Sequence, residues 1–203
     1  MKENNLILLG GCALAFIILY FGTGAKIFCF LFAFFTLLLI FFFLSFRDPE
    51  REVVKNDRVL LSPADGKVID VRKDKISIFM RLFDVHVVRS PCKGKVVAIK
   101  RIKGSHFPAF LNETDRKNER VTIFIECDGG QITLNMIAGM LARTVISYVG
   151  VGDIVEQGEK IGMIVLGSRV DMIFPDIWVL SIQRGKKVRG GLSIIARKRG
   201  RNV

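Results

Sequence analysis

The sequence has few of the residues from which metal centres and disulfide frameworks are built. Its four cysteines, Cys12, Cys29, Cys92 and Cys127, form no CxxC pair and show no spacing typical of metal ligands. We therefore expect free thiols, a reducing compartment and no metal site.

Acidic residues are scarce relative to basic ones. The chain has 31 lysines and arginines against 19 aspartates and glutamates, a net charge of +12. Such a surface suits nucleic acid, anionic lipid or acidic substrates. No recognisable nucleic-acid-binding motif accompanies the charge. Next to the apolar N-terminus described below, the charge favours an anionic membrane surface as partner and no nucleic acid.

Charged residues are nearly absent from the first part of the chain, where two long apolar runs lie. Leu6–Gly22 is barely long enough to cross a bilayer and Ile27–Phe46 is comfortably long enough. We predict that residues 1–47 form a membrane anchor of two apolar helices in a hairpin. One span with an interfacial helix is an alternative. A cleaved signal peptide fits poorly, because no clear small-x-small site separates the runs.

Flanking cations predict the orientation of this anchor. Lys2 precedes the first run, Arg47, Arg51 and Lys55 follow the second, and Lys26 alone marks the turn between them. The positive-inside rule then places both ends at the cytoplasmic face of the cell membrane. The rest of the chain is expected on that face.

Residues 48–203 have the pattern of a β domain. Short runs rich in Val and Ile, several of them alternating, are separated by Gly, Pro, Asp and Asn. The predicted strands are Lys67–Arg72, Lys75–Met80, His86–Arg89, Lys95–Lys103, Arg120–Cys127, Gln131–Ile137, Ser147–Val149, Lys160–Val165, Arg169–Phe174 and Ser193–Arg197. Only Asn135–Arg143 has a plausible helical alternative. We expect a mainly β, compact sandwich or barrel.

One stretch of this domain indicates a particular architecture. Residues Val149–Gly162, with the run Gly-Asp-Ile-Val and further glycines, resemble the barrel-sandwich-hybrid folds of lipoyl and biotinyl domains. No lysine lies in a clear carrier context, so a swinging-arm carrier is not expected. The pattern predicts a fold and no activity.

Four local motifs together resemble one enzyme family. They are Leu-Ser-Pro-Ala-Asp-Gly-Lys-Val at 61–68, Phe-Asp-Val-His-Val-Val-Arg-Ser-Pro-Cys-Lys-Gly at 83–94, Asn-Glu-Arg at 118–120 and Leu-Gly-Ser-Arg-Val-Asp at 166–171. In this order and spacing they are similar to the phosphatidylserine decarboxylases, especially the short form. The resemblance runs from about residue 48 to 197.

The resemblance implies that the chain is a proenzyme that cuts itself between Gly167 and Ser168. The serine hydroxyl attacks the preceding carbonyl to give an ester, and β-elimination and hydrolysis leave a pyruvoyl group in place of Ser168. The reaction needs a β-oxygen, and glycine lets the backbone distort. The products are a β chain of residues 1–167 and an α chain of residues 168–203, held together as a heterodimer. A higher oligomer is left open.

The same resemblance implies the catalysed reaction. The pyruvoyl ketone forms a Schiff base with the serine headgroup of phosphatidylserine and accepts electrons as carbon dioxide leaves, which yields phosphatidylethanolamine for phospholipid biosynthesis. A related decarboxylase acting on an ether lipid with the same headgroup stays open. A non-catalytic, membrane-tethered adaptor explains the anchor, the strands and the charge, but not the motifs.

The family pattern assigns roles to two further residues. His86, one of only two histidines, is expected to act as acid or base near the reacting carbon. Asp65 corresponds to an aspartate that in longer members activates the serine through a histidine, although its Pro-Ala-Asp-Gly context also suits a turn. Arg89 stands where those members have a second histidine, so the complete relay is missing here. His106 matches no functional position.

Overall fold

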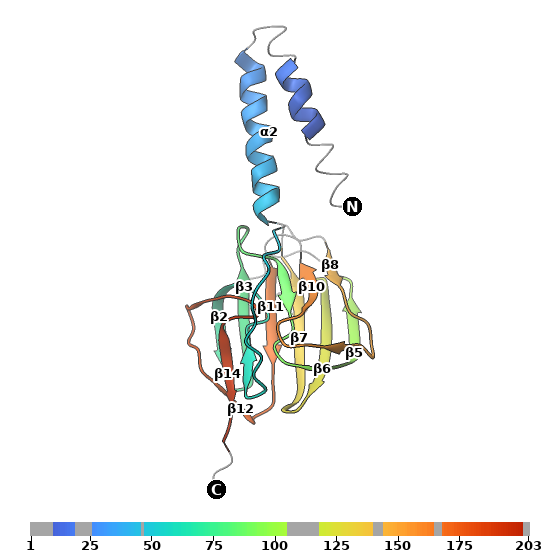
Figure 1. Ribbon diagram of the computed structural model, residues 1–203, viewed down its shortest axis with the longest axis vertical. Coiled ribbons are helices and arrows are strands. Elements are labelled where there is room, and N and C mark those ends of the chain that lie inside the picture. The colour runs from blue at the N-terminus through green and yellow to red at the C-terminus, as the bar shows by residue number, and fades with distance from the viewer. Residues whose placement is uncertain are drawn as a thin grey trace. The chain divides into compact units, whose positions relative to one another are not determined.

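The computed structural model describes residues 10–18, 26–45, 47–104, 118–139, 144–164 and 168–200 (Figure 1). These residues divide into two compact units, Met1–Phe46 and Arg47–Val203. Each unit is considered by itself.

The first unit is helical. Residues 10–18 form one helix and α2 spans Lys26–Ser45. The rings of Phe16 and Phe35 stack with their centroids 5.2 Å apart, so the two helices are in contact. Within the residues described, no helix meets both the length and the apolar character required of a membrane span. The predicted hairpin of two spans is therefore unsupported by the described residues.

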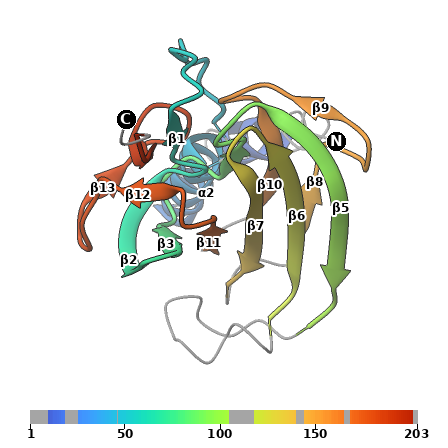
Figure 2. The same ribbon diagram turned by 90° about the horizontal axis from the view of Figure 1, so that it is seen from below.

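The second unit is built on an antiparallel sheet of eight strands in its described part. In spatial order these are β13 (Lys187–Val188), β2 (Gly66–Arg72), β3 (Lys75–Met80), β11 (Ser168–Ile173), β7 (Gly130–Ala138), β6 (Arg120–Cys127), β5 (Gly94–Ile102) and β9 (Ile154–Val155). Figure 2 shows β2, β3, β11, β7, β6 and β5 following one another across this sheet. The central strand β11 is thus contributed by a segment far along the chain from its neighbours.

Two three-stranded sheets pack with the large one. The first has the order β1 (Val59–Leu61), β14 (Ile194–Lys198) and β12 (Trp178–Leu180), and the second has the order β4 (Val87–Arg89), β10 (Lys160–Ile164) and β8 (Val145–Ser147). All their pairings are antiparallel. The mainly β class predicted from the sequence is confirmed, whereas the likeness to barrel-sandwich hybrids stays a prediction.

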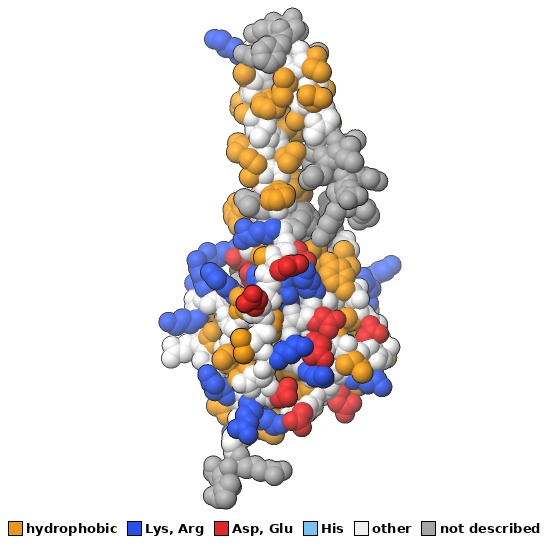
Figure 3. Space-filling view, viewed as in Figure 1, with side chains coloured by type: hydrophobic (Ala, Val, Ile, Leu, Met, Phe, Trp, Pro, Cys, Tyr) orange, Lys and Arg blue, Asp and Glu red, His pale blue; other side chains and the backbone are white. Residues whose placement is uncertain are grey.

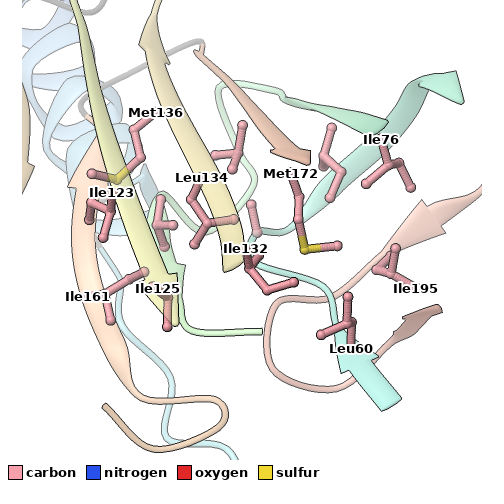
Figure 4. Packing of buried hydrophobic residues seen from close by; sticks show 14 of the residues in the cluster. Leu60, Ile76, Ile123, Ile125, Ile132, Leu134, Met136, Ile161, Met172 and Ile195 are labelled. Carbon is pink, nitrogen blue, oxygen red and sulfur yellow. The ribbon is translucent and has the colours of Figure 1, made fainter. Parts of the chain in front are cut away.

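The three sheets share one hydrophobic core. Figure 4 shows Leu60 of β1, Ile161 of β10 and Ile195 of β14 packed with Leu134 of β7 and Met172 of β11. All five side chains are fully buried. Alternation places these apolar side chains on the inner face of each strand, as the period-2 pattern predicted. The core therefore holds β11, and with it Ser168, against strands from both halves of the chain.

The predicted strands correspond closely to the observed ones. Lys75–Met80 and Arg120–Cys127 have the observed bounds, and Asn135 continues as strand to Ala138 instead of forming a helix. The strand predicted at Ser147–Val149 has the wrong bounds, since β8 spans Val145–Ser147. Four short strands had not been predicted: β1, β9, β12 and β13.

Candidate active site

Ser168 is the first residue of β11 and lies between the last residues of two neighbouring strands. It pairs with Met80 of β3 on one side and with Ala138 of β7 on the other. It is fully buried, and its Oγ donates to Sδ of Met80 at 3.3 Å. A thioether is a weak acceptor, so this hydroxyl is held out of water by a weak hydrogen bond to the described part of the chain. Gly167, the other predicted cleavage residue, lies outside the described residues, as does His106.

The strand end beside Ser168 is braced by a buried asparagine. Asn118 Nδ2 donates to the carbonyl oxygen of Ala138 at 2.7 Å, and the Ala138 amide donates to the carbonyl oxygen of Glu119 at 2.9 Å. Asn118 is 1% exposed. The Asn-Glu-Arg motif seen in the sequence thus has a structural consequence, because it secures the strand that pairs with the serine.

His86 directly precedes β4, the strand that pairs with β10. It is buried, and its carbonyl oxygen accepts a hydrogen bond from the amide of Ile164, the last residue of β10, at 3.1 Å. Residues 165–167 connect Ile164 to Ser168, and residues 81–85 connect Met80 to His86. Ser168 pairs with Met80 and Ile164 with His86, and each pair is joined to the other by a short stretch of chain. His86 and Ser168 therefore lie in one region of the domain.

Asp65 is engaged in an ion pair that the sequence did not predict. Both its carboxylate oxygens accept from Arg51, at 2.6 and 2.8 Å, and Oδ1 also accepts from the Gly190 amide at 2.7 Å. Arg51 in turn donates to the Gly190 carbonyl. In the structure Asp65 joins the segment that enters the domain to the turn before β14. Its proposed role in activating the serine stays a prediction.

Arg89, which the resemblance places where a second histidine was expected, has a structural role. Its Nη1 donates to the carbonyl oxygen of Gly158 and its Nη2 to that of Pro49, each at 3.0 Å, and Asp48 lies 3.5 Å away. Burial and the neighbouring Arg51 lower the pKa of this guanidinium. Arg89 therefore secures the same entering segment as Asp65 does.

A buried charged cluster follows the serine directly. Arg169 and Asp171 form a two-point ion pair, with Nε–Oδ1 2.9 Å and Nη2–Oδ2 3.1 Å, and Lys75 of β3 lies 2.8 Å from Asp171. Arg169 and Asp171 are 3% and 2% exposed. Sequence reasoning missed this cluster, although two charged residues at alternate positions of an otherwise apolar strand were the available signal. Alternation places them on the face of β11 opposite Val170 and the core.

The arrangement suits chemistry at a protected serine. A buried hydroxyl of this kind, beside the bond predicted to be cut, is a group from which a pyruvoyl cofactor can form, and exclusion of water prevents side reactions. His86 is the titratable residue that the connections bring to this region. Among the described residues, no cluster of three or more His, Cys, Asp or Glu side chains offers a metal site.

Comparisons with known proteins agree with this reading. A profile of the phosphatidylserine decarboxylase family matches residues 38–196. The chain is 47% identical over 156 residues to a protein of Methanosarcina barkeri named "Putative archaetidylserine decarboxylase proenzyme". This match covers 77% of this chain and 76% of the Methanosarcina protein. It is 37% identical over 166 residues to the phosphatidylserine decarboxylase proenzyme of Solibacter usitatus, covering 80% and 81% of the two chains. For the proenzyme of that name from Carboxydothermus hydrogenoformans, the identity is 36% over 176 residues, covering 81% and 83%.

The chain therefore belongs to the phosphatidylserine decarboxylase family. It is a decarboxylase that is made as a proenzyme and then processed.

Proposed function

We propose that the chain cleaves itself between Gly167 and Ser168, converts Ser168 into a pyruvoyl group and decarboxylates a serine phospholipid to the corresponding ethanolamine lipid. The observation that carries the proposal is the position of Ser168: a buried hydroxyl at the start of a strand, directly after the segment to be cut, which donates to the thioether sulfur of Met80 at 3.3 Å.

In the cleavage step the chain's own residues supply the reacting groups. Ser168 Oγ attacks the Gly167 carbonyl carbon, so a C–O bond replaces the peptide C–N bond. Loss of the Cα proton then breaks the Cβ–O bond and releases the upstream carboxylate. His86 is the proposed acid or base; in support, its carbonyl oxygen accepts from the amide of Ile164, four residues before Ser168 in the chain. The dehydroalanine left at position 168 then takes up water and loses its nitrogen as ammonia, which gives the pyruvoyl group. This group supplies the electron-accepting ketone that decarboxylation needs.

The strand pairings support a heterodimer after cleavage. The proposed α chain, residues 168–203, contributes β11, which pairs on both sides with strands of the proposed β chain, residues 1–167. β13 and β14 pair with β2 and β1 in the same way. Breaking one peptide bond leaves all these hydrogen bonds in place, so the two chains are expected to stay together.

We further propose that the enzyme works at the cytoplasmic face of the cell membrane. Large apolar side chains lie exposed along α2, including Phe30 (70% exposed), Leu37 (67%) and Phe43 (65%), and Figure 3 shows apolar side chains covering this surface. Exposed apolar surface of this extent is costly in water and is typical of contact with lipid. The cations that follow α2 favour attachment from the cytoplasmic side.

The lipid tail distinguishes two candidate substrates. Phosphatidylserine is the substrate implied by the family description, with phosphatidylethanolamine as product. Relatives from three Methanosarcina species, 45 to 47% identical, are instead named for archaetidylserine. The reacting headgroup has the same chemistry in both candidates, so the ether lipid is the second candidate.

The test is release of carbon dioxide from carboxyl-labelled serine phospholipid by the purified full chain. Wild type should release label from phosphatidylserine, from its ether-lipid counterpart or from both, and the ratio of the two rates identifies the substrate. Ser168→Ala should release none, whereas Ser181→Ala, which changes an exposed serine of the same α-chain segment, should match wild type. Failure of wild type to release label from either lipid would refute the proposal and favour the non-catalytic adaptor.

A further inference from the structure

The loop after β3 presents an aromatic ring to solvent at the end of the sheet where Ser168 lies. Arg81 and Asp84 close a tight turn: the Asp84 amide donates to the Arg81 carbonyl at 3.0 Å and the Arg81 amide to Asp84 Oδ2 at 2.8 Å. Phe83 nevertheless remains 59% exposed. Because the loop begins directly after Met80, the strand partner of Ser168, it starts at the candidate active site.

The loop is also tied to the point where the chain enters the domain. Arg47 Nη2 donates to the carbonyl oxygen of Phe83 at 3.2 Å. Arg47 is the second residue after α2, the helix with exposed apolar side chains. The loop that carries the exposed ring is therefore held by hydrogen bonds of the Arg47 and Asp84 side chains, close to where the chain enters the domain.

A cationic edge lies at the same end of the large sheet. Lys67 of β2 pairs directly with Lys187 of β13, and both side chains are exposed, as is Arg189. Lys67 also pairs with Phe79 of β3, one residue before Met80, which places this edge level with the serine. Like charges directly opposite each other are unfavourable in a sheet. Figure 3 shows lysine and arginine side chains gathered on the side of the domain that carries β2.

We propose that Lys67, Arg81, Phe83, Lys187 and Arg189 form a docking surface for an anionic phospholipid bilayer, with the Phe83 ring inserted at the headgroup boundary. An apolar ring surrounded by cations is the combination that binds anionic lipid interfaces. Arg47, which donates to the Phe83 carbonyl oxygen, follows the apolar helix by two residues along the chain, and this favours lipid over a protein partner. The proposal rests on the proposed function and adds to it: docking turns the Ser168 end of the sheet toward the headgroups that carry the substrate.

A tryptophan at position 83 tests the contact directly. The only native tryptophan, Trp178, is 3% exposed, so it gives a constant background. The full-length Phe83→Trp protein is reconstituted into phosphatidylcholine vesicles with and without phosphatidylglycerol, and its fluorescence is quenched with brominated lipid. We expect quenching of about twofold, stronger when phosphatidylglycerol is present.

The matched control is Gln131→Trp, an exposed position at the start of β7. It lies seven residues from Ala138, the strand partner of Ser168, or about 23 Å along the strand. It should not be quenched. Equal quenching of the two variants, or none at position 83, would overturn the docking surface.

A charge variant separates docking from catalysis. Lys187→Glu should lower the rate on serine phospholipid embedded in anionic vesicles by roughly fivefold or more at low salt, while Lys187→Arg should not. Both should match wild type on a short-chain serine phospholipid dissolved as monomers. An equal loss by Lys187→Glu on both substrates, or no loss on vesicles, would contradict docking. Inactivity of wild type on monomers and vesicles alike would instead refute the proposed function, and the quenching experiment would still decide the docking surface.

Discussion

The ion pair between Arg51 and Asp65 offers a quantitative test of how the entering segment stabilises the domain. Its two side chains are 8% and 14% exposed, and two hydrogen bonds of 2.6 and 2.8 Å join them. Removing one partner of a buried pair costs about 3–5 kcal/mol, because the other charge is left uncompensated. After Arg51→Met, Asp65 keeps the Gly190 amide at 2.7 Å and some contact with water, so we expect about 3 kcal/mol, at the lower end of that range.

The assay is urea unfolding of the detergent-solubilised full chain, followed by fluorescence of Trp178. The Ser168→Ala background keeps the chain in one piece, so that unfolding is not coupled to dissociation. The double variant Arg51→Met/Asp65→Asn should lose clearly less than the sum of the two single variants, since neither charge is then left alone. A loss below about 1 kcal/mol for Arg51→Met, or additivity of the two changes, would refute the reasoning.

Three further predictions concern the core, the thiols and the histidine. Gly66→Ala should prevent accumulation of folded, processed enzyme in a solubility and cleavage assay, because a Cβ at this position would overlap the carbonyl oxygen of Phe79. Gly150→Ala, whose Cβ would make an ordinary contact with Asp153 Oδ2 at 3.8 Å, should give more folded protein. A hydrogen bond with the Cys92 thiol lowers the pKa of Cys127 to about 7, so the rate at which iodoacetamide alkylates Cys127 should rise between pH 6 and 8. Cys92→Ala should move that rise to higher pH. An unchanged pH profile in this variant would contradict the hydrogen bond between the two thiols. His86→Gln should slow self-cleavage or carbon dioxide release by about 10²-fold or more with little change in unfolding free energy, and wild-type rates would remove its role as acid or base.

The sequence predicts most strands because their signal is local. β3 and β6 are rich in Ile, Val and Phe, and each alternates over part of its length, as in Lys75–Ile78 and Arg120–Ile123, which is sufficient to place their bounds. β12 and β13 have three and two residues, too few for a period to show. They are strands because β14 and β2 lie beside them, and that pairing depends on the whole fold.

The candidate site divides in the same way. Ser168 and His86 stand in local motifs and could be identified without coordinates. The partners of Asp65 could not, because Gly190 is 125 residues away along the chain and Arg51 reads as an ordinary juxtamembrane cation. Arg169 would be expected on a solvent face by alternation alone, and only the packed sheet shows that it is buried.

The central claim is that the bond between Gly167 and Ser168 is broken by the chain itself and leaves a pyruvoyl group. Intact mass spectrometry of purified wild type beside Ser168→Ala tests it most directly. The account predicts two chains for wild type, residues 1–167 and residues 168–203, the smaller one without a free amino terminus, and a single whole chain for the variant. A single uncut wild-type chain that retains its fold would contradict the account.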